Sequence, residues 1–242
     1  MADDFTFIIK TLLRPRCVHR LIDSIISTFP RAQILVADDS PVPISRKGIK
    51  VFHLPNDCGV SFGRNYLVDR VDTPFFVCCD DDVILTHNTQ LNKLLKPLRG
   101  NTFDLVGSYY VTENVRFVWE GIFERFGDVL TFRAGNHGEV DDIYRYDMCH
   151  NFFVANTSKV QAVRWDDELK VGEHTDFFLR ALGKLRVGVD PQTSILHQPE
   201  TNPEYETFRA RLDEYRPLFM KKHGLRVYRN EVLPDASYEL SS

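Results

Sequence analysis

Four short apolar segments in the first 80 residues, separated by stretches of helical pattern, constrain the fold more than any other feature of this sequence. They cover residues 5–10, 34–37, 51–54 and 75–79, and helical patterns at 19–29 and 61–71 separate them. Segments that lack polar alternation are typical of strands buried on both faces of a parallel sheet. We therefore predict an α/β fold, a single compact unit with a mostly parallel central sheet flanked by helices.

The second half of the chain has a less regular pattern. We expect its strands and helices at 104–111, 151–155, 175–182, 186–189, 194–197 and 204–223, the last one a helix with Gly224 at its C-cap. Residues 112–147 carry aromatic side chains among many polar ones without a clear period, which favours a substrate-binding insertion over a sheet. Residues 236–242 we expect to be a frayed tail.

Charge and hydropathy exclude several classes of protein. The chain has 34 Asp and Glu against 30 Lys and Arg, a net charge of −4, and no basic run, so it is a poor candidate for binding nucleic acid. No apolar stretch is long enough for a transmembrane segment. The acidic start, Met1-Ala2-Asp3-Asp4, does not suit a secretory signal. Five cysteines without a zinc-binding spacing favour reduced thiols.

Polar residues directly follow three of the predicted strands. Thr11 and Arg14 come after the first, Asp38 and Asp39 after the second, and Asp80-Asp81-Asp82 after the fourth. Ligands of open α/β sheets bind outside the carboxyl ends of the strands, so we expect these residues to be neighbours at one crevice. The first strand is not followed by G-x-G-x-x-G, so this Rossmann-like beginning lacks the dinucleotide-binding pattern.

The triplet Asp80-Asp81-Asp82 is the strongest functional signal. Three adjacent carboxylates repel one another unless a cation lies among them. Mg²⁺ and Mn²⁺ prefer oxygen ligands, and such sites commonly combine a few carboxylates with substrate phosphates. The alternative is an acidic turn that caps the next element, but the position of the triplet after the apolar run 75–79 favours a metal site.

Asp38, Asp39 and Arg64 each allow two interpretations. The pair of aspartates could form a turn and a helix cap, or it could accept hydrogen bonds from a base or a ribose. Arg64 could be a surface residue of its helix, or it could bind an anion near the helix N-terminus. Several such positions at the ends of neighbouring strands favour the binding interpretation.

Two later segments carry candidate catalytic or metal-binding groups. His197 ends the final apolar segment and is either a buried structural histidine or a late metal ligand. The run Glu173-His174-Thr175-Asp176 begins a helix, where Thr175 or Asp176 could cap the helix. Alternatively, a carboxylate of this run could act as a general base.

Taken together in order, these motifs resemble the GT-A glycosyltransferases of the broad family-2-like type, most nearly the animal β-1,4-N-acetylgalactosaminyltransferases. The motifs that carry the resemblance are Lys10-Thr11-Leu12-Leu13-Arg14, Val36-Ala37-Asp38-Asp39-Ser40, Gly63-Arg64-Asn65, Asp80-Asp81-Asp82, Asp104-Leu105-Val106-Gly107, Asn151-Phe152-Phe153 and Leu185-Arg186-Val187-Gly188. Each motif is short, so the specificity lies in their order, from about Phe5 to His197.

The resemblance implies a role for each matched residue. Those expected to hold the uracil, ribose and neighbouring groups of a UDP-sugar are Thr11, Arg14, Asp38, Asp39, Arg64, Asp80 and Asp81. Asp82 and His197 would bind Mn²⁺ or Mg²⁺, and the acceptor would meet Trp119, Asn151 and Glu173. Asp176 matches the acidic position of the base in inverting members. Many relatives carry Glu-Asp where this chain has Thr175-Asp176, so His174 and Glu173 stay alternatives.

The function implied by the resemblance is metal-dependent, inverting transfer of GalNAc, Gal, Glc or GlcNAc from a UDP-sugar to a hydroxyl of a glycan or glycolipid. Residues 1–230 would form the catalytic domain, with a nucleotide-sugar-binding half at 1–107, an acceptor-binding half at 108–230 and a tail at 231–242. We expect a cytoplasmic enzyme or an excised catalytic domain of a membrane-anchored one. The alternatives are a binding module without turnover and a haloacid-dehalogenase-type phosphatase, which also has a D-x-D after a strand.

Overall fold

A computed structural model describes residues 4–113 and 115–240. Within them, the central sheet has 11 strands in the order β10-β11-β13-β6-β12-β4-β1-β2-β3, with β5 paired to β13 and β7 to β6. In chain order these strands are β1 (Phe5–Thr11), β2 (Gln33–Asp38), β3 (Lys50–His53), β4 (Phe75–Asp80), β5 (Val83–Ile84), β6 (Leu105–Thr112), β7 (Val115–Phe117), β10 (Glu139–Val140), β11 (Ile143–Tyr146), β12 (Phe153–Asn156) and β13 (Val187–His197).

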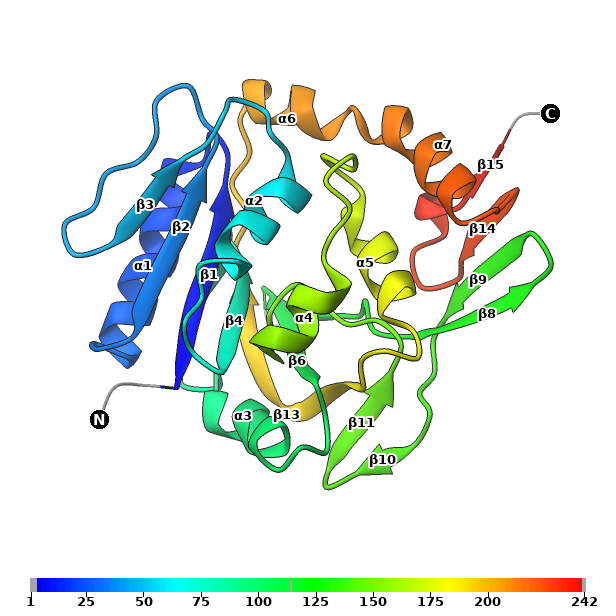
Figure 1. The fold of residues 1–242 in the computed structure, drawn as a ribbon, viewed down its shortest axis with the longest axis horizontal. Coiled ribbons are helices and arrows are strands. Elements are labelled where there is room, and N and C mark those ends of the chain that lie inside the picture. Colours follow the sequence, from blue (N-terminus) through cyan, green and yellow to red (C-terminus); the bar gives the residue numbers. More distant parts are fainter. Residues whose placement is uncertain (1–3, 114, 241–242) are drawn as a thin grey trace.

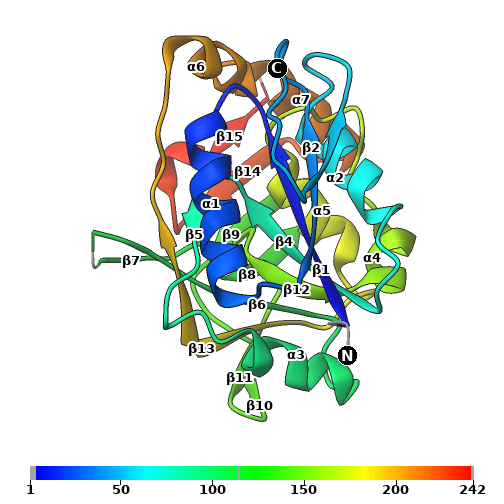
Figure 2. The ribbon, with the colours of Figure 1, turned by 90° about the vertical axis from the view of Figure 1, so that its left-hand side faces the viewer.

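Helices cover both faces of this sheet (Figures 1 and 2). In chain order the helices are α1 (Pro15–Thr28), α2 (Val60–Val68), α3 (Leu91–Arg99), α4 (Thr157–Val163), α5 (Glu173–Ala181), α6 (Pro203–Arg209) and α7 (Leu212–Lys222), and the last two run along one edge of the sheet, at the top of Figure 1. The α/β fold with a central sheet flanked by helices, predicted from the apolar segments, is confirmed. The sheet is mixed, because β12 runs antiparallel to both of its neighbours, β4 and β6.

The register of the parallel strands brings the polar strand ends together. Lys10 at the end of β1 pairs with Asp80 at the end of β4, and Thr11 pairs with Asp38 at the end of β2. The carboxyl ends of the three strands therefore lie at one edge of the sheet. This is the arrangement expected from the rule that ligands bind at that edge.

Alternating side chains of β1 enter two separate hydrophobic clusters. Phe7 and Ile9 pack with Ile22 of α1 and with other side chains of α1 and α3. Ile8 packs on the opposite face with Leu67 of α2 and with side chains of α4 and α5. Side chains of a strand point to opposite faces with a period of two, so a strand that is apolar throughout needs helices on both faces.

The expected irregular insertion at 112–147 is wrong, because this segment forms strands. In addition to β7, β10 and β11, it contains β8 (Ile122–Phe126) and β9 (Val129–Arg133), which make a hairpin. The hairpin joins β14 (Val227–Asn230) and β15 (Tyr238–Glu239) in a second, four-stranded sheet. Tyr238–Glu239 therefore pair with β14, although we expected fraying from Ala236. The parallel pairing of β9 with β14 joins segments distant in sequence, so local periodicity could not reveal it.

Other boundaries differ from the predicted ones for local reasons. α1 begins at Pro15, because proline suits the first turn of a helix. The two final strands expected at 186–189 and 194–197 are one strand, β13, whose register shifts between Val189 and Ser194. The single helix expected at 204–223 is two helices, α6 and α7. Gly224 lies one residue beyond the C-cap His223, with a φ of +60° that favours glycine.

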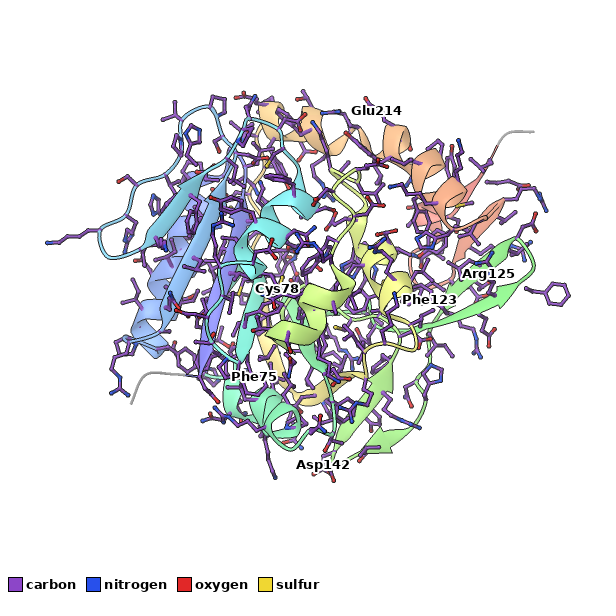
Figure 3. All side chains as sticks on the ribbon, in the orientation of Figure 1. Phe75, Cys78, Phe123, Arg125, Asp142 and Glu214 are labelled. Atoms are coloured by element: carbon purple, nitrogen blue, oxygen red, sulfur yellow. The ribbon has the colours of Figure 1, made fainter. Side chains whose placement is uncertain are left out.

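The two expected halves of the domain share one sheet, because β6 crosses the division at residue 107. Figure 3 labels Cys78 in the interior of this sheet, while Asp142 and Glu214 lie at opposite edges of the molecule. No helix of the described residues is long and apolar enough to cross a membrane.

Candidate active site

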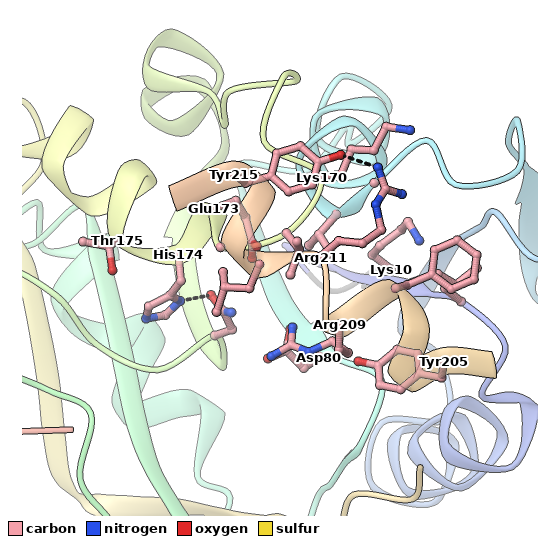
Figure 4. A pocket seen from close by; sticks show the side chains of 18 of the residues that line it. Lys10, Asp80, Lys170, Glu173, His174, Thr175, Tyr205, Arg209, Arg211 and Tyr215 are labelled. Carbon is pink, nitrogen blue, oxygen red and sulfur yellow. Dashed lines mark hydrogen bonds between the residues drawn. The ribbon is translucent and has the colours of Figure 1, made fainter. Parts of the chain in front are cut away.

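A cavity of about 540 Å³ opens at the carboxyl edge of the sheet. Its wall includes the ends of β1 and β4, the start of α5, the end of β13, and residues of α6 and α7. Figure 4 shows Asp80 near the middle of the pocket, with Lys10 and Tyr205 on one side and His174 and Thr175 on the other. The strand-end residues predicted from the sequence therefore meet in one cavity, with the exception of Asp38.

Arg14 neutralises two carboxylates of the acidic triplet. Its guanidinium donates from Nη1 to Oδ2 of Asp82 at 2.8 Å and pairs through Nη2 with Asp81. Thr11 donates from Oγ1 to Asp81 at 2.6 Å. Burial raises the pKa of Asp82, but the nearby imidazole of His197 and the hydrogen bond from Arg14 outweigh it and lower this pKa to about 2. Asp82 is therefore ionised at neutral pH.

Arg64 neutralises the third carboxylate and connects it to α5. This arginine is 3% exposed and donates to Asp80 at 2.6 Å and to Oε1 of Glu173 at 2.7 Å. The surface-residue interpretation of Arg64 is therefore wrong. The repulsion that we used to predict a metal is relieved in part by two arginines, both distant from the triplet in the sequence.

Asp38 and Asp39 have different surroundings. Both oxygens of Asp38 accept backbone N–H groups, from Ser40 at 2.9 Å and from Ile44 at 2.7 Å, so this carboxylate holds the loop after β2. Asp39 lines the cavity, pairs with Lys10 and accepts the N–H of Gly59 at 3.2 Å. Of the two, only Asp39 lies on the cavity wall.

The side chains of Asp82 and His197 converge and could share a metal ion. Nε2 of His197 lies 3.7 Å from Oδ2 of Asp82, and its Nδ1 lies 3.3 Å from Oγ1 of Thr112. One carboxylate and one imidazole suit Mn²⁺ or Mg²⁺ when substrate oxygens and water complete the coordination. Among the described residues no group of three or more His, Cys, Asp or Glu could hold a metal, so further ligands would have to come from the substrate and water.

The start of α5 places its three candidate bases differently. Glu173 and His174 line the cavity, whereas Asp176 does not. Asp176 is 1% exposed, and its Oδ1 lies 2.7 Å from Nε2 of His223. Burial lowers the pKa of His174 to about 3, so its imidazole is neutral and weakly basic. Glu173 is thus the carboxylate of this segment that faces the cavity.

The predicted acceptor residues lie beside these groups. Trp119 and Asn151 both line the cavity. Oδ1 of Asn151 lies 2.8 Å from Nδ1 of His174, and the ring of Trp119 meets the His174 ring edge-on, 5.6 Å between centroids. Trp119, Asn151 and Glu173, separated in the sequence, thus form one part of the wall.

Sequence reasoning missed several cationic and aromatic residues of the cavity. Tyr205 of α6 stacks on Arg14 at 4.2 Å, and Arg209 ends the same helix. Arg211 and Lys170 both bind Asp57, at 2.7 and 2.9 Å. The expectation of one continuous amphipathic helix at 204–223 concealed the break before α7, which is where Arg209 and Arg211 reach the cavity.

Solved structures with the same fold place the chain in a class. TarS of S. aureus in complex with UDP-GlcNAc superposes with a TM-score of 0.63 at 14% identity, covering 86% of this chain and 61% of that one. TarS in complex with UDP superposes with a TM-score of 0.60 at 17% identity, covering 88% of this chain and 64% of that one. The fold, with the acidic triplet at its sheet edge, is that of the GT-A class.

Sequence comparisons identify the family. Residues 6–155 match Glycosyl transferase family 2. Beta-1,4 N-acetylgalactosaminyltransferase 1 of Rattus norvegicus is 36% identical over 191 residues, 74% of this chain and 36% of its own length. Beta-1,4 N-acetylgalactosaminyltransferase 2 of Mus musculus is 30% identical over 94% of this chain and 47% of its own length. The chain belongs to glycosyl transferase family 2, and it spans less than half the length of these two relatives.

Proposed function

We propose that this chain transfers a sugar from a UDP-sugar to an acceptor hydroxyl on a glycan or glycolipid, with inversion at the anomeric carbon. The observation that carries the proposal is the placement of the acidic triplet and Glu173 in one cavity, where Asp80 of the triplet and Glu173 lie 2.6 and 2.7 Å from the same guanidinium of Arg64. Membership of the family supports the reaction class. The N-acetylgalactosaminyltransferase relatives support GalNAc as the sugar to test first.

The nucleotide is proposed to bind at the ends of β1, β2 and β4. Asp39 and Thr11 lie at the cavity wall, where they can accept or donate hydrogen bonds to a base or ribose. The cavity also carries cations that can pair with a diphosphate, namely Lys10, Arg14, Lys170, Arg209 and Arg211. Guanidinium groups suit phosphate because they donate two parallel hydrogen bonds.

Asp82 and His197 are the residues that we propose hold Mn²⁺ or Mg²⁺. When bound, this ion would supply positive charge to the diphosphate leaving group. Arg14 occupies Oδ2 of Asp82 in the present structure, so metal binding requires this guanidinium to shift or to share the carboxylate. The same guanidinium could then pair with the phosphates.

Glu173 is proposed as the general base, in place of Asp176. An acceptor hydroxyl is a weak nucleophile until its proton is accepted as the new bond forms. Glu173 lines the cavity, and the contact of its Oε1 with Arg64 fixes the direction of the carboxylate. Asp176 faces His223 and Arg180 instead. One oriented base and one stabilised leaving group are sufficient for a single displacement.

The experiment is a measurement of UDP release from UDP-GalNAc, UDP-GlcNAc, UDP-Gal and UDP-Glc, with Mn²⁺ or with EDTA. We expect release from at least one donor, dependent on the metal and lost in Asp82→Asn. Binding of UDP-sugars without release, at any metal concentration, would favour the binding module without turnover. Release of orthophosphate from simple phosphomonoesters would favour the phosphatase.

A further inference from the structure

The cavity has a second end, away from the acidic triplet, that the proposed reaction leaves without a role. Beyond α5 its wall is formed by Tyr215 and Phe219 of α7, Tyr228 of β14 and Tyr238 of β15. We call these four residues the aromatic end. α7 and the small sheet meet here at the side of the molecule opposite α1 and β3 (Figure 1).

The rings of the aromatic end are held by contacts with one another and with nearby cations. Phe219 and Tyr228 meet edge-on, with 5.9 Å between centroids. The guanidinium of Arg216 lies 5.7 Å from the centre of the Tyr238 ring. Phe219 and Tyr228 are buried, while Tyr215 and Tyr238 are only partly covered. The aromatic end thus has a fixed floor and two rings that a ligand could contact.

Polar groups accompany the rings. The hydroxyl of Tyr215 accepts from Arg211 at 2.9 Å, and that of Tyr228 accepts from Nδ2 of Asn230 at 3.3 Å. Thr175 adds a further hydroxyl to the cavity wall. A pyranose has apolar C–H faces and a rim of hydroxyls, so it suits aromatic rings with polar groups at their edges. Each tyrosine hydroxyl accepts in these contacts, so its own O–H can donate to a sugar hydroxyl, a partner that an alkyl chain does not offer.

The aromatic end is continuous with the proposed reaction centre. Thr175 lies two residues after Glu173 in α5, about 3 Å along the helix axis at the rise of an α-helix. Both residues line the same cavity, and Figure 4 shows Thr175 beyond His174 on the side away from Lys10. A sugar linked to the reacting sugar could therefore extend from Glu173 toward Tyr228.

We propose that the aromatic end is a subsite for the second sugar of the acceptor, so that the preferred acceptor is a glycan of at least two sugar residues. This inference rests on the proposed function and adds the class of acceptor. It makes Tyr238 a specificity-determining residue, whereas Tyr215 borders the proposed diphosphate site through its hydrogen bond with Arg211.

The test compares three acceptors that share the reacting sugar: a methyl glycoside, the methyl glycoside of a disaccharide, and an octyl glycoside. We expect the disaccharide to exceed the methyl monosaccharide about tenfold in kcat/KM. Tyr238→Ala should remove most of that advantage, while UDP-sugar hydrolysis and transfer to the monosaccharide stay unchanged. Tyr238→Phe should keep it. Phe126→Ala is the control, since Phe126 is 90% exposed on the β8–β9 hairpin and lies outside the cavity.

Binding of the disaccharide to the wild type and to Tyr238→Ala is also compared, by saturation-transfer NMR in the presence of UDP. This measurement does not depend on turnover. Equal signals for the wild type and Tyr238→Ala would overturn the inference. An advantage of the octyl glycoside without one for the disaccharide would also overturn it, in favour of an apolar group at the aromatic end. Failure of the proposed function would appear differently, as an absence of UDP release with every donor and acceptor.

Discussion

Nη1 of Arg64 lies 2.7 Å from Oε1 of Glu173, although 109 residues separate the two in the chain. Nη2 of the same guanidinium donates to Asp80 at 2.6 Å. One buried arginine of α2 thus joins the end of β4, where we place the donor, to the start of α5, where we place the base. The two parts of the proposed reaction centre are held at a fixed separation by this side chain.

Removal of Arg64 should destabilise the fold as well as the site. Arg64→Ala leaves the carboxylates of Asp80 and Glu173 without their partner in a largely buried region, which costs about 3–5 kcal/mol of the free energy of unfolding. Arg64→Lys keeps the charge but cannot bridge both groups, so its loss should be smaller. Urea unfolding at pH 7 measures both. Arg46→Ala, which breaks an exposed pair with Asp23, is the control and should cost less than about 1 kcal/mol. An equal, small effect of both alanine variants would contradict the bridging role.

Substitutions of Glu173 and Asp176 should have different effects on kcat in steady-state kinetics. Glu173→Gln keeps an oxygen that can accept from Arg64 but cannot take a proton, so kcat should fall about 10²–10⁴-fold. UDP affinity should be unchanged. Asp176→Asn weakens a buried contact with His223 and should lower thermal stability while most of kcat remains. A nearly inactive Asp176→Asn beside an active Glu173→Gln would return the role of base to Asp176.

His197 should matter for metal binding more than for folding. His197→Ala removes one of the two proposed ligands, so Mn²⁺ affinity in the presence of UDP should fall at least tenfold, as measured by electron paramagnetic resonance. The melting temperature of the metal-free chain should change little, because the polar contacts of this side chain are long, 3.7 Å to Asp82 and 3.3 Å to Thr112. His53→Ala, on the exposed edge of β3, is the matched control. If melting temperature collapses while Mn²⁺ affinity holds, His197 is a structural histidine.

The stability of the fold should fall at mildly acidic pH because of His150. Burial lowers the pKa of this histidine to about 3, against about 6.5 in the unfolded chain. As the pH falls below 6.5 only the unfolded chain takes up the proton, so stability is lost progressively until about pH 3. The loss from His150 alone should be about 2 kcal/mol between pH 7 and pH 5.

Urea unfolding of the wild type and of His150→Gln at both pH values measures this contribution. The glutamine can keep the hydrogen bond to the carbonyl of Phe117, which His150 makes at 2.9 Å, but it does not titrate. The wild type should lose more stability than the variant between pH 7 and pH 5. Identical losses would contradict a buried, neutral His150.

The sequence predicts well which residues lie at the carboxyl edge of the sheet, where we place the sugar donor. The strand pattern is local in the sequence, and the rule that ligands bind at the carboxyl edge holds for open α/β sheets in general. Thr11 and Asp81 come at the ends of apolar strands and therefore meet once the strands pair in parallel. The sequence places Arg14 and Arg64 near this edge, but their pairing with particular carboxylates of the triplet could not be predicted in this way. Arg14 and Arg64 reach it through loop and helix geometry, which residue spacing does not encode.

The acceptor side was predicted less well for a related reason. β9 pairs with β14, almost one hundred residues later, and this pairing creates the aromatic end. Nothing in the local pattern of residues 112–147 indicates such a partner. The contact of Asp176 could not be predicted either. The helix period places Asp176 about one turn from Glu173, but it does not indicate that His223, at the end of α7, contacts the Asp176 carboxylate.

The measurement that tests the central claim most directly is a ¹H NMR time course of UDP-GalNAc with this chain, Mn²⁺ and a panel of glycan acceptors. The account predicts that UDP accumulates together with a new β-anomeric signal of the transferred sugar, and that both are lost in Glu173→Gln. A product that retains the α configuration, or a donor that binds and stays intact with every acceptor, would contradict it.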